Sequence, residues 1–433
     1  MPAVLTFSRR LGAVTLALAA LAIAFGAAQS PERRKLLVLS VDGLDWRYLR
    51  DADRLGLKIP SLRRLMAEGE TADGVLGATP TVTWPSHTTL ITGVEPSRHG
   101  ILGNQRPRDE GGDYYWKADL LKVDTLWHAT RRAKLTSAAI TWPVTVDADI
   151  DWNLPELFAK RRGGAMDLPS IASKSTPGLV ERITAMYPSF PQEWMDDRTR
   201  ALATMYLMRE PRPDLTLVHF VDLDSEAHDN GPFTREANAM LEYTDELVGR
   251  ILAVLPANVV VALVSDHGFE RTDRVTNVAA LLSRIGVKSG ANVEAGLLLA
   301  TDDVAAAAIR KARTDPEHGI GREVPIDELR RIDPSRSRGQ VVAAFEPADF
   351  TMFGRDQASP SLTLPAREKG GHYGWPGRYR ATFVLWGPGI RPARTPEIRM
   401  TEIASRFAAV LGVPFMPGAP TAPCSPAHLD DPA

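Results

Sequence analysis

Four segments with strand character, three of them almost continuously apolar, constrain the fold of this chain most. They span residues 35–41, 136–141, 215–221 and 258–265. Near-continuous apolar runs are typical of parallel strands that are buried on both faces of a sheet. Residues 234–255, between the last two runs, follow a long helical pattern. This alternation of strand and helix predicts an α/β protein with a mostly parallel sheet.

Aspartate follows three of these predicted strands. Asp42 comes directly after the first run, Asp224 shortly after the third, and Asp266 with His267 after the fourth. Asp and Gly often end strands in turns, and that explanation would suffice for any one position. Ligands of parallel sheets gather at the carboxyl ends of the strands, however, so three occurrences at equivalent ends indicate a ligand site.

Two histidines extend this set. His228 follows Asp224 by four residues, which places both side chains on one face of a helical turn. His372 lies in the glycine-rich stretch 370–374, where the backbone can come close to a ligand. The chain has one cysteine, Cys424, so a metal would depend on carboxylates and imidazoles. The candidate ligands are Asp42, Asp224, His228, Asp266, His267 and His372.

Three carboxylates and three imidazoles are the donors that two zinc ions need when each takes three protein ligands and keeps an open position. Two ions about 4 Å apart would clamp the attacking and leaving oxygens of an in-line displacement at phosphorus. The sequence therefore predicts a two-metal phosphohydrolase centre that holds zinc, with other divalent metals as alternatives.

Thr83 is the expected nucleophile of this centre. It precedes Trp84 and Pro85, and residues 88–94 behind them have the character of a buried helix. Proline disfavours a helical residue before it, so we expect Thr83 at the helix N-terminus, where free N–H groups attract an anion. Threonine is a weak nucleophile at neutral pH, so a metal or a base has to activate it.

The first 28 residues have the plan of a secretory signal peptide. Arg9 and Arg10 precede an apolar run to Ala24, and small residues follow up to Ala28. We expect cleavage near Ala28 and a periplasmic or secreted protein. An uncleaved membrane anchor is the alternative, and it would be the one membrane contact of the protein.

Composition limits the partners of the remaining chain. It is 44% hydrophobic and 24% charged, which is typical of a globular protein. Its formal net charge of -2 provides no basic field for a nucleic-acid backbone. The expected partner is therefore a small phosphorylated substrate.

The motifs together resemble the type I phosphodiesterase/nucleotide pyrophosphatase branch of the alkaline phosphatase superfamily. The resemblance extends over residues 35–412 in the family's order. It rests on Val41-Asp42-Gly43, Thr83 to Gly93, His99-Gly100-Ile101, Asp224 to His228 with Gly231-Pro232, Ser265 to Gly268, and the His372 loop.

This resemblance implies an alkaline-phosphatase-like three-layer sandwich around a mostly parallel central sheet. It implies that Thr83 forms a phospho-threonine intermediate, which water then hydrolyses, and that Thr83 can itself bind one ion. It also implies the division of the ligands: one zinc on Asp42, Asp266 and His267, and the other on Asp224, His228 and His372.

One position departs from the family pattern. Family diesterases carry Phe-Pro-Asn where this chain has Trp84, Pro85 and Ser86. Since the family's Asn helps to hold a phosphate oxygen, we expect Ser86 to make this contact less well or through water, and Asn104 to face the pocket. The sulfatase branch needs a Cys/Ser-x-Pro-x-Arg motif, which residues 83–89 lack, so a sulfatase is disfavoured.

Residues 273–365 leave the alternating pattern and mix short helices with short strands. We expect an inserted α+β cap subdomain here that shapes access to the metal site. The catalytic domain would then comprise residues 35–272 and 366–412, and a Pro- and Ala-rich tail, expected to be mobile, would span 413–433.

Two other functions stay open. One is a phosphomonoesterase or phosphonate hydrolase of the same superfamily. The other is a catalytically silent extracytoplasmic binding protein that keeps the fold, although the presence of the nucleophile and all six ligands argues against it. The remaining histidines near the motifs, His87, His99 and His219, are expected to be packed in the interior rather than bound to metal.

Overall fold

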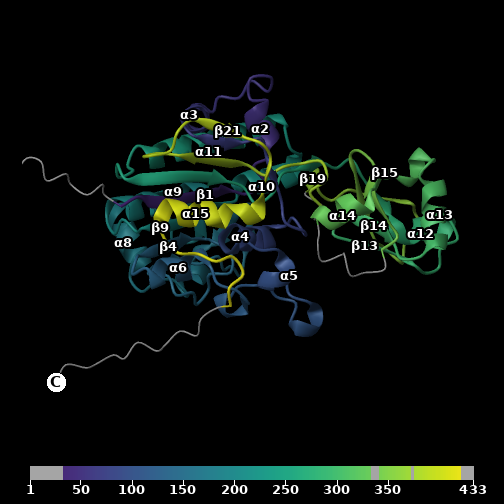
Figure 1. Cartoon of the computed structure of the whole chain (residues 1–433), viewed down its shortest axis with the longest axis horizontal. Coiled ribbons are helices and arrows are strands. Elements are labelled where there is room, and N and C mark those ends of the chain that lie inside the picture. Colours follow the sequence, from purple (N-terminus) through teal and green to yellow (C-terminus); the bar gives the residue numbers. More distant parts are fainter. Residues whose placement is uncertain (1–32, 333–340, 372–374, 421–433) are drawn as a thin grey trace, which may run out of the picture. The chain divides into compact units, whose positions relative to one another are not determined.

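An eight-stranded sheet lies at the centre of the chain (Figure 1). The computed structural model describes residues 33–332, 341–371 and 375–420. In spatial order, the strands of the sheet are β21 (Ala393–Thr395), β2 (Glu70–Ala72), β20 (Phe383–Trp386), β10 (Val259–Val264), β1 (Lys35–Val41), β9 (Leu215–Phe220), β4 (Ser137–Ile140) and β5 (Trp152–Leu154).

The sheet is mostly parallel, as the sequence predicts. Five neighbouring strands, from β10 through β1, β9 and β4 to β5, share one direction. The exception is β20, which runs antiparallel to both β10 and β2. The predicted strands at 35–41, 136–141, 215–221 and 258–265 are all present, with ends that differ by at most one residue.

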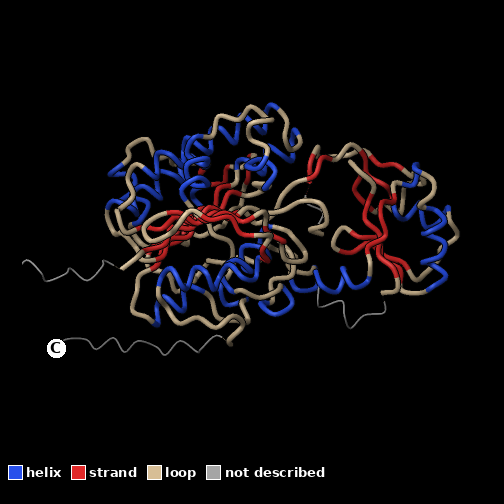
Figure 2. Tube along the Cα trace, turned by 45° about the horizontal axis from the view of Figure 1, so that its top comes forward, coloured by secondary structure: helices blue, strands red, loops and turns tan. Residues whose placement is uncertain are grey.

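Helices cover both faces of the sheet (Figure 2). Successive side chains of a strand point to opposite faces, so a strand that is apolar throughout needs a covering layer on each side. On β1, Leu37 and Leu39 pack in one apolar core, and Leu36 and Val38 pack in the other. The helices of the first core include α2 (Trp46–Arg50), α3 (Pro60–Glu68), α8 (Leu179–Met186), α9 (Asp197–Arg209) and α11 (Arg235–Leu252). Those of the second are α4 (Thr83–Thr92), α6 (Leu126–Arg132) and α15 (Ile403–Leu411). This is the expected three-layer sandwich.

Residues 274–364, here called the cap, have small sheets and an apolar core of their own. A four-stranded antiparallel sheet consists of β13 (Ala291–Glu294), β14 (Leu297–Ala300), β16 (Ala343–Pro347) and β15 (Ile320–Val324). A three-stranded sheet consists of β17 (Thr351–Gly354), β12 (Arg274–Asn277) and β18 (Thr363–Leu364). The helices of the cap are α12 (Val278–Arg284), α13 (Asp303–Ala312) and α14 (Ile326–Ile332).

An apolar cluster and a strand pair are among the connections between the cap and the rest of the fold. Its β14 residues Leu297 and Leu299 share an apolar cluster with Leu76 and Trp375. At its base, β11 (Glu270–Arg271) pairs antiparallel with β19 (Gly370–Gly371), so the chain enters and leaves the cap side by side. In the chain, β11 follows β10 and the Asp266-His267 pair closely.

No helix in the described part of the chain has both the length and the hydropathy needed to cross a bilayer. The predicted signal peptide, residues 1–28, lies outside the described residues, as does most of the predicted tail.

Candidate active site

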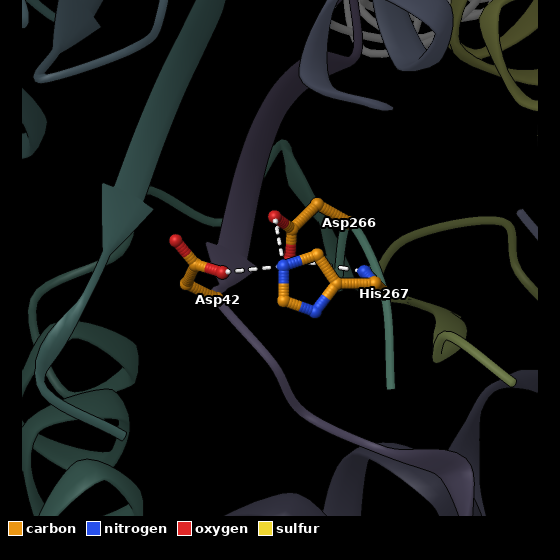
Figure 3. A group of neighbouring side chains, drawn as sticks. All are labelled: Asp42, Asp266 and His267. Atoms are coloured by element: carbon orange, nitrogen blue, oxygen red, sulfur yellow. Dashed lines mark hydrogen bonds and ion pairs between the residues drawn. The ribbon is translucent and has the colours of Figure 1, made fainter. Parts of the chain in front are cut away.

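Two carboxylates and one imidazole meet at the carboxyl ends of the neighbouring strands β1 and β10 (Figure 3). Asp42 directly follows β1, and Asp266 and His267 follow β10. Nε2 of His267 lies 3.3 Å from Oδ1 of Asp42 and 3.2 Å from Oδ2 of Asp266. All three side chains are buried. The fold thus brings together three of the six candidate ligands.

The chemistry of this cluster fits a bound cation. Oδ1 of Asp42 and Oδ2 of Asp266 are buried and accept no hydrogen bond from any described residue. Nδ1 of His267 lies 3.2 Å from the carbonyl oxygen of Gly268. Because a carbonyl only accepts, Nδ1 carries the hydrogen, and Nε2 turns its lone pair toward the two carboxylates. Two carboxylate oxygens and an imidazole lone pair that converge in this way form a metal-binding arrangement.

The turn after Asp42 depends on glycine. Gly43 has a φ of +70°, and its N–H donates to Oδ1 of Asp266 at 3.1 Å. A Cβ at this position would lie 2.5 Å from Cε2 of the Phe269 ring. Glycine satisfies both the left-handed backbone and the close contact, so Asp42 and Asp266 can be tied together by this turn.

Asp224 and His228 lie one turn apart on α10 (Asp222–Asn230), as their spacing predicts. Oδ1 of Asp224 is 3.4 Å from Nε2 of His228. The other ring nitrogen, Nδ1, lies 3.0 Å from Oε2 of Glu368 and 3.2 Å from the carbonyl of Gly370, so it acts as a donor. This orientation directs Nε2 to the ligand position. The sixth candidate ligand, His372, lies outside the described residues.

The carboxylates raise one another's pKa. Burial, and then the charge of Asp224, raise the pKa of Asp42 to about 6. Burial and the charge of Asp42 raise the pKa of Asp266 well above its usual value. Burial lowers the pKa of His228, but the charge of Asp224 opposes it, and the net result is a pKa of about 11. A cation held among these groups would offset this accumulation of negative charge.

A cavity of about 440 Å³ opens beside these groups. Its lining includes Asp42, Thr83, Asn104, Asp224 and His228. The predicted nucleophile therefore shares one space with a ligand from the first set and with both described ligands of the second.

Thr83 is the first residue of α4, as expected, but the N-terminus of this helix offers few free N–H groups. Pro85 has no N–H, and the N–H of Ser86 is used within the helix, by the carbonyl of Val82. The Trp84 N–H donates to Oδ1 of Asn104 at 3.0 Å. The expectation of a cradle of free backbone donors is therefore wrong for these three positions.

The two expected substrate contacts differ in their surroundings. Ser86 is fully buried and is not among the residues that line the cavity. Asn104 does line the cavity, and its carbonyl oxygen is held by the Trp84 N–H. We therefore leave Ser86 out of the proposed substrate contacts and keep Asn104.

The sequence did not reveal a buried acid and histidine behind Asp42. His219 on β9 has Nε2 3.0 Å from Oδ2 of Asp42 and Nδ1 2.8 Å from Oε2 of Glu156. Burial lowers the pKa of His219, but the charge of Glu156 and the bonds to both carboxylates outweigh it and raise the pKa to about 10. His219 is an interior histidine with partners, as expected, yet one of those partners is a candidate metal ligand. Glu156 follows the three-residue strand β5 and belongs to no motif.

An arginine at the cavity was also missed. Arg161 lies on β6 (Arg161–Arg162), which forms a hairpin with β7 (Ala165–Asp167). Its guanidinium donates to Oγ of Ser225 at 3.0 Å and to the carbonyl of Gly163 at 2.7 Å, and it lies 3.9 Å from Oδ2 of Asp224. Of the described residues that line the cavity, it is the only Lys or Arg. The Gly163-Gly164 turn was the one local signal of this hairpin.

Comparison with known proteins assigns this arrangement to a family. The model of the type I phosphodiesterase / nucleotide pyrophosphatase family matches residues 36–345. The chain belongs to this family. The match contains Asp42, Thr83, Asp224 and the Asp266-His267 pair, and it continues into the cap.

Curated relatives are similar over part of their length. Ectonucleotide pyrophosphatase/phosphodiesterase family member 1 of Mus musculus is 26% identical over 249 residues, which are 54% of this chain and 24% of that protein. Venom phosphodiesterase 2 of Crotalus adamanteus is 24% identical over 282 residues, which are 60% of this chain and 30% of that protein. The matched part of the chain thus spans about a quarter to a third of these relatives.

Solved structures show the same fold. Murine ectonucleotide pyrophosphatase / phosphodiesterase 5 superimposes with a TM-score of 0.59 at 18% identity, covering 90% of this chain and 98% of that chain. The human counterpart superimposes with a TM-score of 0.58 at 16% identity, covering 90% of this chain and 97% of that one. The alkaline-phosphatase-like fold expected from the sequence is confirmed.

Proposed function

We propose that this chain is a metal-dependent hydrolase that cleaves phosphodiester or pyrophosphate bonds, with Thr83 as the nucleophile. The observation that carries the proposal is the shared cavity, which Thr83 lines together with Asp42, Asp224 and His228. Membership of the type I phosphodiesterase / nucleotide pyrophosphatase family supports the reaction class.

Two zinc ions are the proposed cofactors. Asp42, Asp266 and His267 would hold one, and Asp224 and His228 would hold the other together with His372. When bound, such ions supply positive charge that stabilises phosphate oxygens and lowers the pKa of a nearby hydroxyl. A lowered hydroxyl pKa would make the weakly nucleophilic Thr83 reactive at neutral pH.

The residues of the chain would then carry out a two-step displacement. Oγ of Thr83 attacks phosphorus, and a new P–O bond forms as the bond to the leaving oxygen breaks. Water then attacks the phospho-threonine, which releases phosphate product and restores the Thr83 hydroxyl. Since its carbonyl oxygen is held by Trp84, Asn104 would present its amide N–H to a phosphate oxygen.

A nucleotide is the substrate class that we propose first. A solved structure of an inactive threonine-to-alanine variant of murine ectonucleotide pyrophosphatase / phosphodiesterase 5 is in complex with AMP. In this chain, Trp84 and Tyr114 line the same cavity as Thr83, with ring centroids 4.8 Å apart. The face of Tyr114 would provide a surface on which a base can stack.

A specific observation favours a second candidate, the hydrolysis of phosphomonoesters. These substrates carry more negative charge on the reacting phosphate than diesters do, and Arg161 places a fixed cation beside Asp224 and the cavity. The same cation would suit the additional phosphate of a pyrophosphate substrate.

Steady-state hydrolysis of bis-p-nitrophenyl phosphate and p-nitrophenyl phosphate by zinc-loaded protein tests the proposal, with a chelator control. We expect chelator-sensitive turnover with a preference for the diester. A preference for the monoester would establish the second candidate. If folded, metal-loaded protein turned over neither substrate, both candidate hydrolase functions would be contradicted. The catalytically silent binding protein would then be the remaining function.

Thr83→Ala should abolish this turnover and leave metal binding unchanged, because Thr83 forms the covalent intermediate. Thr92→Ala is the matched control: Thr92 lies on the same helix, its hydroxyl donates to the carbonyl of Thr88, and it is not among the residues that line the cavity. Residual activity of Thr83→Ala close to that of Thr92→Ala would remove Thr83 from the mechanism.

We also propose that the protein acts outside the cytoplasm, in the periplasm or as a secreted protein, because residues 1–28 have the plan of a signal peptide. N-terminal sequencing of the exported protein should begin near Gln29. An intact Met1 on exported protein would instead indicate a retained anchor.

A further inference from the structure

We propose that Glu156 and His219 are positioning residues for Asp42, which select the Asp42 oxygen that binds metal. This inference rests on the proposed function, since it concerns the ion assigned to Asp42, Asp266 and His267. It starts from the chain of short contacts that runs from Glu156 through His219 to Asp42.

The two oxygens of Asp42 have different surroundings. Oδ2 lies 3.0 Å from Nε2 of His219, whereas Oδ1 lies 3.3 Å from Nε2 of His267 and has no hydrogen-bond donor among the described residues. In Figure 3, one Asp42 oxygen points to the His267 ring and the other points away from it. A carboxylate that gives one oxygen to a donor has a fixed plane, and its second oxygen is then aimed at the metal position.

The His219 ring is itself held in place from its other side. Nδ1 lies 2.8 Å from Oε2 of Glu156 and 3.1 Å from the carbonyl oxygen of Thr141. Both of these groups are acceptors, so Nδ1 carries a hydrogen, and Nε2 donates its own to Asp42. Glu156 and His219 are both almost completely buried, and Glu156 also lines the cavity that contains Thr83.

The backbone at Thr141 is strained in a way that serves this arrangement. Thr141 has a φ of +46°, a left-handed conformation that is rare for a β-branched residue. Its hydroxyl accepts from Nε of the buried Arg200 at 3.0 Å and donates to the carbonyl of His219 at 3.0 Å. Strain of this kind persists where the surroundings enforce it, and here it directs the Thr141 carbonyl at the His219 ring.

The contacts of Asp42 leave one of its oxygens for the metal position. Oδ2 is engaged by the His219 ring, whereas Oδ1 lies at the His267 ring. Loss of the ring would allow the Asp42 carboxylate to turn, and loss of Glu156 would leave the ring with a carbonyl as its one acceptor at Nδ1.

Zinc affinity, measured by competition with a chromophoric chelator, tests the inference. His219→Leu should weaken the first of the two zinc sites by about 10–100-fold, the typical effect of removing a partner of a metal ligand. His219→Gln keeps a donor that can reach Asp42, so it should restore part of the lost affinity. The absorption spectrum of cobalt-substituted protein should change in His219→Leu, because the ligand geometry changes.

Two further variants keep the test decisive. Glu156→Gln preserves the size of the side chain and should weaken zinc binding at the same site by a smaller factor. This variant still tests the inference if His219→Leu fails to fold. His99→Gln is the matched control, since His99 is another buried histidine with a partner at each nitrogen, Thr89 and Ile101. It should lower the melting temperature and leave zinc affinity unchanged.

The outcomes separate this inference from the proposed function. Folded His219→Leu and Glu156→Gln proteins that bind both ions as tightly as the wild type would overturn the positioning role alone. If the wild type bound no zinc and turned over neither test substrate, the proposed function would be overturned as well.

Discussion

Gly43 and Gly56 have nearly the same backbone conformation, with φ of +70° and +67°, but different surroundings. A Cβ at Gly56 would meet nothing within 4 Å, whereas one at Gly43 would meet the Phe269 ring at 2.5 Å. This pair separates the cost of a left-handed alanine from the cost of disturbing the metal site.

We expect Gly56→Ala to lower the free energy of unfolding by about 1–2 kcal/mol, from backbone strain alone. Gly43→Ala should cost about 1–3 kcal/mol more, because the ring or the turn has to move. It should also weaken zinc binding, since the turn ties Asp42 to Asp266. Denaturant unfolding and zinc competition measure both effects. Equal losses of stability in the two variants would contradict the role given to Phe269.

His99 predicts a pH dependence of stability that is independent of the metal ligands. It lies at the end of α5 (Pro96–His99), where Nδ1 accepts from the Ile101 N–H at 3.2 Å. Protonation would place a hydrogen against that N–H, and burial lowers the pKa of the ring from 6.5 to about 3. A lowered pKa means that the unfolded chain binds the proton first, so stability is lost as the pH falls from about 6.5 toward 3.

Replacing the ring by an amide removes this dependence. Between pH 7 and pH 5, the wild type should lose about 2 kcal/mol of unfolding free energy relative to His99→Gln. All other titrating groups are common to both proteins, so the difference between two denaturation curves at each pH isolates His99. Parallel pH profiles of the two proteins would show that the ring is not held neutral.

Site residues that belong to a sequence motif were mostly predicted, whereas site residues outside the motifs were not. The Asp42, Asp266 and His267 cluster follows from buried strands that end in acids, because parallel strands place their carboxyl ends together. Ser86 belongs to the motif of Thr83, but the sequence did not reveal that it is buried and absent from the cavity lining. Glu156 and Arg161 could not be found, because one follows a three-residue strand and the other lies on a two-residue strand, and tertiary packing brings both to the site.

At the scale of elements, length decided what could be predicted. The strands β1, β9 and β10 are six or seven residues long and carry a clear apolar pattern. The edge strands β5 and β21, and β2 beside β21, have three residues each, too few for a periodic pattern. The direction of β20 was also not predictable, since a buried antiparallel strand has the same composition as a parallel one.

The β6–β7 hairpin is the element that carries Arg161 to the cavity. A Cβ at Gly164 would lie 2.3 Å from Oδ1 of Asp222, so the hairpin packs closely on the first residue of α10. Arg161 and Arg162 are neighbours on one strand, yet only Arg161 is in the cavity lining.

Arg161→Gln should therefore lower kcat/KM for p-nitrophenyl phosphate more than for bis-p-nitrophenyl phosphate, with Arg162→Gln as the control. A charged hydrogen bond contributes about 1.5–3 kcal/mol, which corresponds to a selective loss of about tenfold to a hundredfold. If both substrates lost activity equally, Arg161 would act on the structure of the hairpin rather than on substrate charge.

For the whole molecule, the proposed metals predict a dependence of stability on free zinc. An ion that binds the folded state alone stabilises it by about 2.7 kcal/mol at a free concentration of 100 times its Kd. Chelation should therefore lower the melting temperature. Asp266→Asn should reduce this zinc-dependent shift, whereas Asp53→Asn, at a carboxylate whose side chain is 93% exposed, should preserve it. An unchanged shift in Asp266→Asn would place the zinc elsewhere.

The antiparallel direction of β20 has a consequence for how this molecule can change. Val264 and Phe383 are partners across β10 and β20, and the pairing resumes between Glu270 and Gly371. Topologically, everything between these partners is the loop of one long hairpin, and the cap is its tip. The entropic cost of closing a loop grows slowly with its length. The cap can therefore be shortened, lengthened or exchanged without a change in the strand order of the central sheet. As a result, the cap can diverge among descendants of this fold while the strands that lead to Asp42 and Asp266 are inherited intact.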